Sequence, residues 1–159
     1  MEAAKEIEKS TAVKAEEEIL KSWDDNKIFE KTLQKTRDAE PYVFYDGPPF
    51  ATGTPHYGHI LGSTVKDAVS RYWTMQGRYV RRRWGWDCHG LPIESLVEQK
   101  LGISGKKQIE ELGVEKFNET CRANVLKFVD EWGKTVHRIG RFVEFDNSYK
   151  TMDSTYMES

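Results

Sequence analysis

The chain has 159 residues, of which 38% are hydrophobic and 31% charged, and its formal net charge is -2. This balance excludes a disordered chain and indicates a globular domain with a core of its own. No apolar run approaches the roughly 20 residues of a membrane span, and residues 1–6 lack the apolar core of a secretory signal. The two cysteines, Cys88 and Cys121, form no CxxC pair, so we expect no disulfide framework, no metal site and a cytoplasmic location.

Residues 1–37 are rich in Glu and Lys and carry apolar residues at helical spacing. The pattern predicts one or two amphipathic helices that pack on a neighbour through Leu20, Trp23, Ile28 and Leu33. We therefore expect an N-terminal helical extension over residues 1–37, followed by a nucleotide-binding domain over residues 38–159.

That domain begins with a pattern of strand, loop, helix and strand. Residues 42–45 predict a buried strand, which the Gly- and Pro-rich residues 46–49 end. Thr54 and Pro55 suit the N-cap and the first position of a helix. We expect this helix to end near Gly77 and to have one apolar face, made by Leu61, Val65, Ala68, Val69 and Tyr72. Residues 79–84 predict a second strand, which gives a parallel βαβ unit with a right-handed crossover.

Helical patterns dominate the rest of the chain. Residues 91–101 and 104–112 predict two helices that end at glycines. Apolar residues separated by threes and fours then predict one long helix over residues 114–139. A strand is expected at residues 142–145, and Asp153 is expected to be the N-cap of a last helix.

A short basic run, made of Arg78, Arg81, Arg82 and Arg83, has two interpretations. It is either a solvated strand edge or a set of phosphate contacts. The net charge of -2 does not indicate a dedicated nucleic-acid binder, since such proteins are usually basic overall.

The residues His56-Tyr57-Gly58-His59 stand where the loop meets the helix. Two histidines three apart lie on one helical face, and a helix N-terminus presents free N–H groups that bind phosphate. Gly58 has no side chain, so a base or ribose can approach the backbone there. In a βαβ unit this position lies at the carboxyl ends of the strands, where nucleotides bind. The pattern predicts a nucleotide-phosphate site, with a surface histidine pair as the alternative.

Two segments of this chain resemble class I aminoacyl-tRNA synthetases. The first resembles the ATP-binding signature of the family and is Pro49-Phe50-Ala51-Thr52-Gly53-Thr54-Pro55-His56-Tyr57-Gly58-His59, with Tyr57 where most members have isoleucine. The second resembles the isoleucine-specific subgroup and is Gly85-Trp86-Asp87-Cys88-His89-Gly90-Leu91-Pro92-Ile93-Glu94. The similarity runs from about Glu17 to Ser159. It implies an α/β fold, namely the first half of a Rossmann-like parallel-sheet domain.

The resemblance also implies roles for single residues. His56 and His59 would be catalytic, contacting the ATP phosphates within a signature that binds ATP, brought as its Mg²⁺ complex. Gly47 and Pro48 would line the amino-acid pocket, and Asp87 would pair with the substrate ammonium group. On its residue type alone, without the resemblance, Asp87 is better interpreted as a turn or helix-cap residue. Cys88 and His89 are assigned no catalytic role.

The implied reaction joins isoleucine to the α-phosphorus of ATP and then transfers the aminoacyl group to tRNA(Ile). Such a reaction needs no enzyme nucleophile, because positioning and electrostatic stabilisation carry it. The second ATP signature of the family, Lys-Met-Ser-Lys-Ser, is absent, and Lys150-Thr151-Met152 does not match it. We therefore expect a half-site that the remainder of a synthetase chain completes, and no aminoacylation by these residues alone.

Three alternatives remain open at this point. A class I synthetase for valine, leucine or methionine would carry a different sequence at residues 85–94. A different nucleotidylyltransferase with the same loop would be complete at about this length but would lack that segment. A non-catalytic chain that binds tRNA or a protein partner through residues 78–83 and the charged helices would bind tRNA with a steep salt dependence and ignore ATP.

Overall fold

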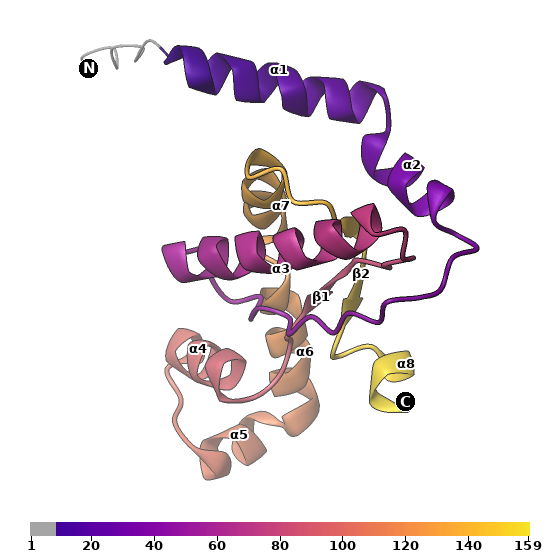
Figure 1. Cartoon of the computed structure of the whole chain (residues 1–159). Helices are drawn as coiled ribbons and strands as arrows, with labels where there is room; N and C mark the ends of the chain where they lie inside the picture. The colour runs from indigo at the N-terminus through magenta and orange to yellow at the C-terminus, as the bar shows by residue number, and fades with distance from the viewer. Residues whose placement is uncertain (1–8) are drawn as a thin grey trace.

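The computed structural model describes residues 9–159, so residues 1–8 of the expected extension lie outside the described part. Two short parallel strands lie at the centre, and helices surround them (Figure 1). Elements run in the order α1 (Thr11–Asp25), α2 (Ile28–Lys35), α3 (Tyr57–Met75), β1 (Arg83–Trp86), α4 (Leu91–Leu101), α5 (Lys106–Leu112), α6 (Val114–Val125), α7 (Val129–Arg138), β2 (Glu144–Lys150) and α8 (Ser154–Met157). Within residues 9–159, no helix is both long and apolar enough to cross a bilayer.

Both strands lie later in the chain than the sequence predicts. Arg83 pairs with Glu144 and Gly85 with Tyr149, so β2 contains three extra residues between these two pairs. The predicted strand at residues 142–145 was wrong at its start, because the Phe142 N–H donates to the Asp67 carboxylate at 3.0 Å and cannot join a ladder. The predicted strand at residues 79–84 retains only an isolated bridge at Tyr79 and the first two residues of β1.

The predicted buried strand at residues 42–45 is also wrong. Parallel bridges join the chain to the β1 segment at Pro41 and again at Phe50, but the residues between them form no ladder. Val43 is 70% exposed and Tyr45 is 93% exposed. The reason lies in Tyr149, whose ring covers Gly85 and whose hydroxyl donates to the Asp46 carbonyl at 3.2 Å. A side chain therefore takes the place of backbone pairing at this point.

Helix α3 contradicts the apolar face predicted for it. Leu61, Val65 and Tyr72 are 68%, 56% and 52% exposed. The helix instead buries Ser63 and Ser70. Both serines lie on a polar inner face, where the small side chains allow close approach of the segment that follows α7. The apolar stripe of α3 has no covering element within residues 9–159.

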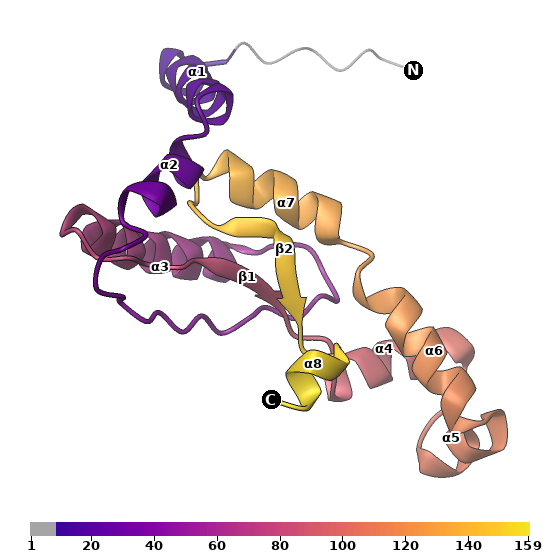
Figure 2. The ribbon, with the colours of Figure 1, turned by 90° about the vertical axis from the view of Figure 1, so that its right-hand side faces the viewer.

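The long helix predicted over residues 114–139 is broken into α6 and α7 (Figure 2). Leu126, Phe128 and Val129 all pack against the core. Residues 126 and 128 would point to opposite sides of a continuous helix, so one straight helix could not bury both. The break allows both to face inward, and periodicity alone does not reveal it. The structure confirms the predicted helix over residues 91–101, which is α4, and the predicted N-cap Asp153, which begins α8.

The core is built around three tryptophans. Trp84 and Trp86 of β1 and Trp132 of α7 are at most 2% exposed, and their ring centroids lie 5.5–5.8 Å apart. The cluster is completed by Ala51, Cys88, Ile93, Val125 and Val136. This core joins β1, α4, α6 and α7, and it holds the segment that follows β1 against the loop that precedes α3.

The N-terminal helices dock through arginine–aromatic contacts. The Arg71 guanidinium lies 3.7 Å from the Phe142 ring centroid and 5.2 Å from that of Trp23 in α1. Arg82 is buried, and its guanidinium lies 5.0 Å from the ring centroid of Phe29 in α2. The same guanidinium donates to the Thr32 hydroxyl at 2.8 Å. The predicted pair of amphipathic helices is therefore present, and it packs on the region around β1 and α3.

Candidate nucleotide-binding site

The two segments that carry the family resemblance lie side by side. Phe50 and Asp87 form a parallel bridge. The Asp87 N–H donates to the Pro49 carbonyl at 2.8 Å, and the Ala51 N–H donates to the Asp87 carbonyl at 3.2 Å. Ala51 is 1% exposed, so the start of the signature is anchored in the core.

The two signature histidines cap the start of α3 reciprocally. The His56 N–H donates to Nδ1 of His59 at 3.3 Å, and the His59 N–H donates to Nδ1 of His56 at 3.4 Å. Their rings stack with centroids 3.6 Å apart. A ring nitrogen that accepts a hydrogen bond carries no proton, so each neutral imidazole has its proton on Nε2. Neither Nε2–H group has a hydrogen-bond partner within residues 9–159, so both can donate to a ligand.

The environment of His59 favours this neutral form. Burial is the main cause that lowers the pKa of His59, and the neighbouring His56 and the charge of Lys66 lower it further. The N-cap of α3 is His56 and not the predicted Thr54. Sequence preferences miss this cap, because histidine is not among the usual N-cap residues.

A cavity of about 310 Å³ opens beside the histidine pair and brings several predicted residues together. Gly58 and His59 line it from the helix, and Gly47 and Pro48 line it from the loop. Pro49 and Phe50 also border this cavity, whereas His56 and Asp87 do not. Phosphate-binding and amino-acid-binding candidates thus share one space.

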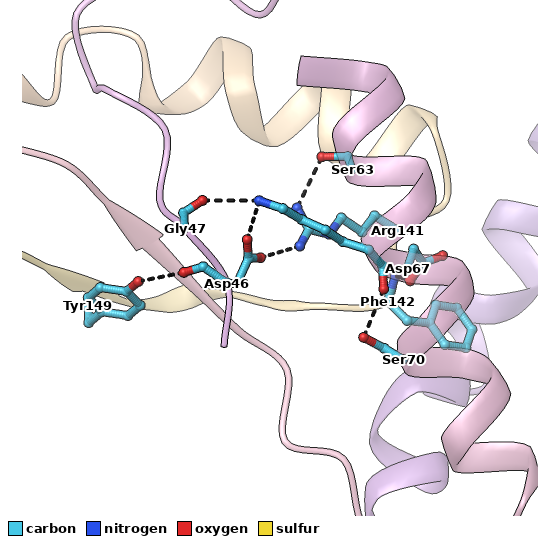
Figure 3. Close-up of polar contacts among 9 residues, drawn as sticks. Asp46, Gly47, Ser63, Asp67, Ser70, Arg141, Phe142 and Tyr149 are labelled. Atoms are coloured by element: carbon cyan, nitrogen blue, oxygen red, sulfur yellow. Dashed lines mark hydrogen bonds and ion pairs between the residues drawn. The ribbon is translucent and has the colours of Figure 1, made fainter. Parts of the chain in front are cut away.

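One wall of the cavity is a polar network that the sequence did not reveal (Figure 3). The Asp46 carboxylate lies between the cations of Lys66 and Arg141. Lys66 also donates to the Gly47 carbonyl at 3.0 Å, and Arg141 donates to the Ser63 hydroxyl at 3.0 Å. The available signal was the spacing of Ser63, Lys66 and Ser70, which marks a polar face of α3.

The charges around this cavity suit an anion. Lys66 and Arg141 each contribute a positive charge, and Asp46 contributes one negative charge. The Arg141 side chain is only 6% exposed, so water screens its charge weakly. The start of α3 adds unpaired N–H groups and the positive end of the helix dipole.

Asp87 stands apart from this network. Its carboxylate is half-buried and makes no ion pair or hydrogen bond within residues 9–159, so it is available to a cationic group. The neighbouring Cys88 is buried, and desolvation raises the pKa of its thiol. A thiol in that environment stays protonated and inert at neutral pH.

The basic run at residues 78–83 is engaged within the chain. Arg78 pairs with Glu40, and Arg83 donates to the Asn147 carbonyl at 2.6 Å. Arg82 is buried, and desolvation lowers its pKa to about 10. Arg81, whose side chain is 60% exposed, fits the solvated-edge interpretation, whereas Arg82 anchors α2.

A larger cavity of about 800 Å³ lies where residues 41–48 separate from β1, beside Arg82, Tyr149 and Tyr156. Neither histidine lines it, so we place the candidate chemistry in the smaller cavity. Within the part of the chain that the structure describes, no three His, Cys, Asp or Glu side chains gather as a metal site.

Comparison with known proteins identifies the family. The model for class I tRNA synthetases (I, L, M and V) matches residues 18–159. The chain therefore belongs to the class I tRNA synthetases. The match covers the signature loop, the histidine pair and the segment around Asp87, which the geometry above brings together.

Within this family the chain is similar to isoleucine–tRNA ligases. It is 53% identical to that of Treponema denticola over 92% of its own length, and 54% identical to that of Chlamydia pneumoniae over 98%. It is 56% identical to isoleucine–tRNA ligase 2 of Pseudomonas fluorescens over 91%. The chain spans only 13–15% of the length of these relatives.

A solved structure supports the fold. The LeuRS chain of the Agrobacterium radiobacter LeuRS–tRNA–LeuAMS complex matches with a TM-score of 0.59 at 19% sequence identity. The match covers 89% of this chain and 16% of that one. The likeness confirms the expected partial Rossmann-like domain with a helical extension.

Proposed function

We propose that this chain is the front part of an isoleucine–tRNA ligase and that the cavity beside α3, lined by His59, binds the ATP phosphates during isoleucine activation together with the adjoining His56 ring. The observation that carries this proposal is the reciprocal histidine cap, which engages both Nδ1 atoms and leaves the two Nε2 atoms to act as donors at a helix N-terminus. The identities of 53–56% to isoleucine–tRNA ligases support the choice of amino acid.

In the proposed reaction the isoleucine carboxylate attacks the α-phosphorus of ATP, forming isoleucyl-adenylate and releasing pyrophosphate. His56 and His59 donate hydrogen bonds to phosphate oxygens, and the positive charge of Lys66 and Arg141 favours the phosphates over water. Gly58 lies against the adenosine. No side chain of this site has to act as a nucleophile, so catalysis comes from positioning and from stabilisation of developing charge.

Gly47 and Pro48 form a wall of the amino-acid pocket, and the free carboxylate of Asp87 pairs with the α-ammonium group. An ion pair at this half-buried position would be stronger than one at the surface. Mg²⁺ arrives with ATP and is held chiefly by its phosphates, as is usual for this ion. The aminoacyl group then passes to tRNA(Ile).

The domain division is also part of this proposal. Residues 1–37 form the helical extension, and residues 38–159 form the first half of the catalytic domain in a cytoplasmic enzyme. The second ATP signature and the rest of the tRNA site belong to a longer polypeptide, in keeping with the 13–15% coverage of the relatives. We therefore expect the 159 residues alone to bind ATP weakly and not to aminoacylate tRNA.

The first test determines the native length with an antibody against this segment and then measures ATP–pyrophosphate exchange by the protein of that length. We expect exchange that depends on isoleucine and is much weaker with valine, leucine or methionine. Faster exchange with another amino acid, or no exchange at all, would contradict the proposed function.

A matched pair of variants tests the histidines. His59→Asn keeps a side-chain acceptor for the helix cap but removes the phosphate donor, so we expect exchange to fall by about 10²-fold, the usual loss for a transition-state donor. His137→Asn alters an exposed histidine on α7 and should leave the rate unchanged. Equal rates for the two variants would contradict the role of His59.

A further inference from the structure

Trp132 of α7 contacts the signature at two separate points. Its indole Nε1–H donates to the Gly53 carbonyl at 2.6 Å. Its ring lies against His59, with the centroids 4.8 Å apart. The side chain is 2% exposed and belongs to the tryptophan core, so its position is fixed by packing. One rigid residue from a distant helix therefore touches both the loop and the second histidine.

The loop has little else to hold it. Residues 52–55 belong to no helix or strand, and the bond from Trp132 is the one hydrogen bond that a side chain makes to them within residues 9–159. On the N-terminal side the chain is anchored at Ala51, and on the C-terminal side it is anchored by the histidine cap. Between these points the path of the backbone depends on the indole N–H.

We propose that Trp132 is a positioning residue for ATP binding, which holds the loop at Gly53 and the ring of His59 in the geometry that receives the phosphates. The inference rests on the proposed function of the same site. It assigns no contact with the reacting atoms to Trp132, which acts through Gly53 and His59. Its removal should therefore change the KM for ATP more than the KM for isoleucine.

The core contains a matched control. Trp86 is 1% exposed, lies 5.8 Å from Trp132 in the same cluster and does not line the cavity, and its indole N–H makes no hydrogen bond within residues 9–159. Phe at position 86 or at position 132 removes the same ring atoms from the same cluster. At position 132 alone it also removes a hydrogen bond to the signature loop. A difference between the two variants isolates that bond from general packing.

The test measures isoleucine-dependent ATP–pyrophosphate exchange by the protein of native length. For Trp132→Phe we expect the KM for ATP to rise about threefold to tenfold, the range that a single lost hydrogen bond gives, with less than a twofold change in the KM for isoleucine. For Trp86→Phe we expect a KM for ATP within about twofold of the unaltered protein. Equal shifts in the two variants, or no shift for Trp132→Phe, would overturn the inference.

A second variant separates the loss of the hydrogen bond from any misfolding of the core. Replacing Trp132 by 3-benzothienylalanine keeps the ring system and exchanges only the N–H for sulfur, so it should reproduce the rise in the KM for ATP. An unchanged KM in this variant would overturn the inference. No exchange by the unaltered protein would instead overturn the proposed function, and the inference with it, so the two failures are distinguishable.

Discussion

Asp46 shows how one side chain can organise a site from outside the recognised motif. Its carboxylate is 15% exposed and pairs with Lys66 and with Arg141, whose side chain is 6% exposed. Its backbone carbonyl accepts from Tyr149. Because Gly47 and Pro48 follow directly, the position of the proposed amino-acid pocket depends on this residue.

We expect Asp46→Asn to lower the free energy of unfolding by about 3 kcal/mol, because it leaves the Arg141 charge buried without a counter-ion. Urea denaturation at neutral pH measures the change. The control is Asp25→Asn, which removes the exposed partner of Lys21 and should cost less than about 0.5 kcal/mol. Similar losses in the free energy of unfolding for both variants would show that the buried Arg141 charge does not depend on the Asp46 carboxylate.

Gly85 provides a second prediction at this scale. A Cβ there would come within 2.1 Å of the Tyr149 ring, so Gly85→Ala should cost about 1–3 kcal/mol of stability. In a Tyr149→Leu background the added cost should be much smaller, since the colliding ring is gone. Gly62→Ala, with open space around it in α3, should stabilise the chain by up to about 1 kcal/mol. Additive costs at positions 85 and 149 would contradict the collision.

At the scale of elements, the start of α3 depends on pH. The cap that His59 supplies requires an unprotonated Nδ1, and the pKa of His59 is lowered in the folded chain. The contribution of this cap to stability is therefore complete above the ordinary histidine pKa of about 6.5 and is lost as the pH falls through the lower value. Urea midpoints measured from about pH 8 to about pH 5 should fall more steeply for the unaltered chain than for His59→Asn. Equal falls in the urea midpoint for the unaltered chain and for His59→Asn would contradict this pH dependence.

Helix α3 also shows what sequence reasoning can and cannot predict. The helix and the place of the histidine pair at a loop-to-helix junction were predictable from local residue chemistry, and the signature residues from the resemblance to the family. The face of the helix that packs was not, because the periodicity of Leu61, Val65 and Tyr72 indicates an apolar stripe without saying what covers it. The network around Asp46 was not predictable for a related reason, because Arg141 lies 95 residues after Asp46 in the sequence.

The break between α6 and α7 has the same origin. Spacings of three and four continue across Leu126 and Phe128, so the sequence pattern resembles one helix. The decision between one helix and two depends on the tryptophan core, which Trp132 joins only after the chain has bent.

At the scale of the whole molecule, two incomplete surfaces stand out. The apolar stripe of α3 is exposed at Leu61 and Val65, and the extended residues 43–47 form no backbone ladder. Exposed apolar patches and unpaired extended edges promote association between molecules. Both surfaces are consistent with a chain that spans a small part of its relatives.

We expect the isolated 159-residue chain to self-associate as its concentration rises, and the double variant Leu61→Gln, Val65→Gln to do so less. Sedimentation velocity over a range of concentrations measures the effect. Val114→Gln changes an apolar residue that is 53% exposed but lies away from this stripe, and it should have little effect. A monomer at every concentration would show that the apolar stripe of α3 does not cause self-association.

The clustering of Trp84, Trp86 and Trp132 has an optical consequence. Indole rings whose centroids lie 5.5–5.8 Å apart in a chiral arrangement couple their electronic transitions, which produces strong circular dichroism in the near ultraviolet. The intensity of that signal reports the packing of the three rings and so the alignment of β1 with α7. A spectrum of the chain would thus follow the arrangement behind the nucleotide loop without any added label.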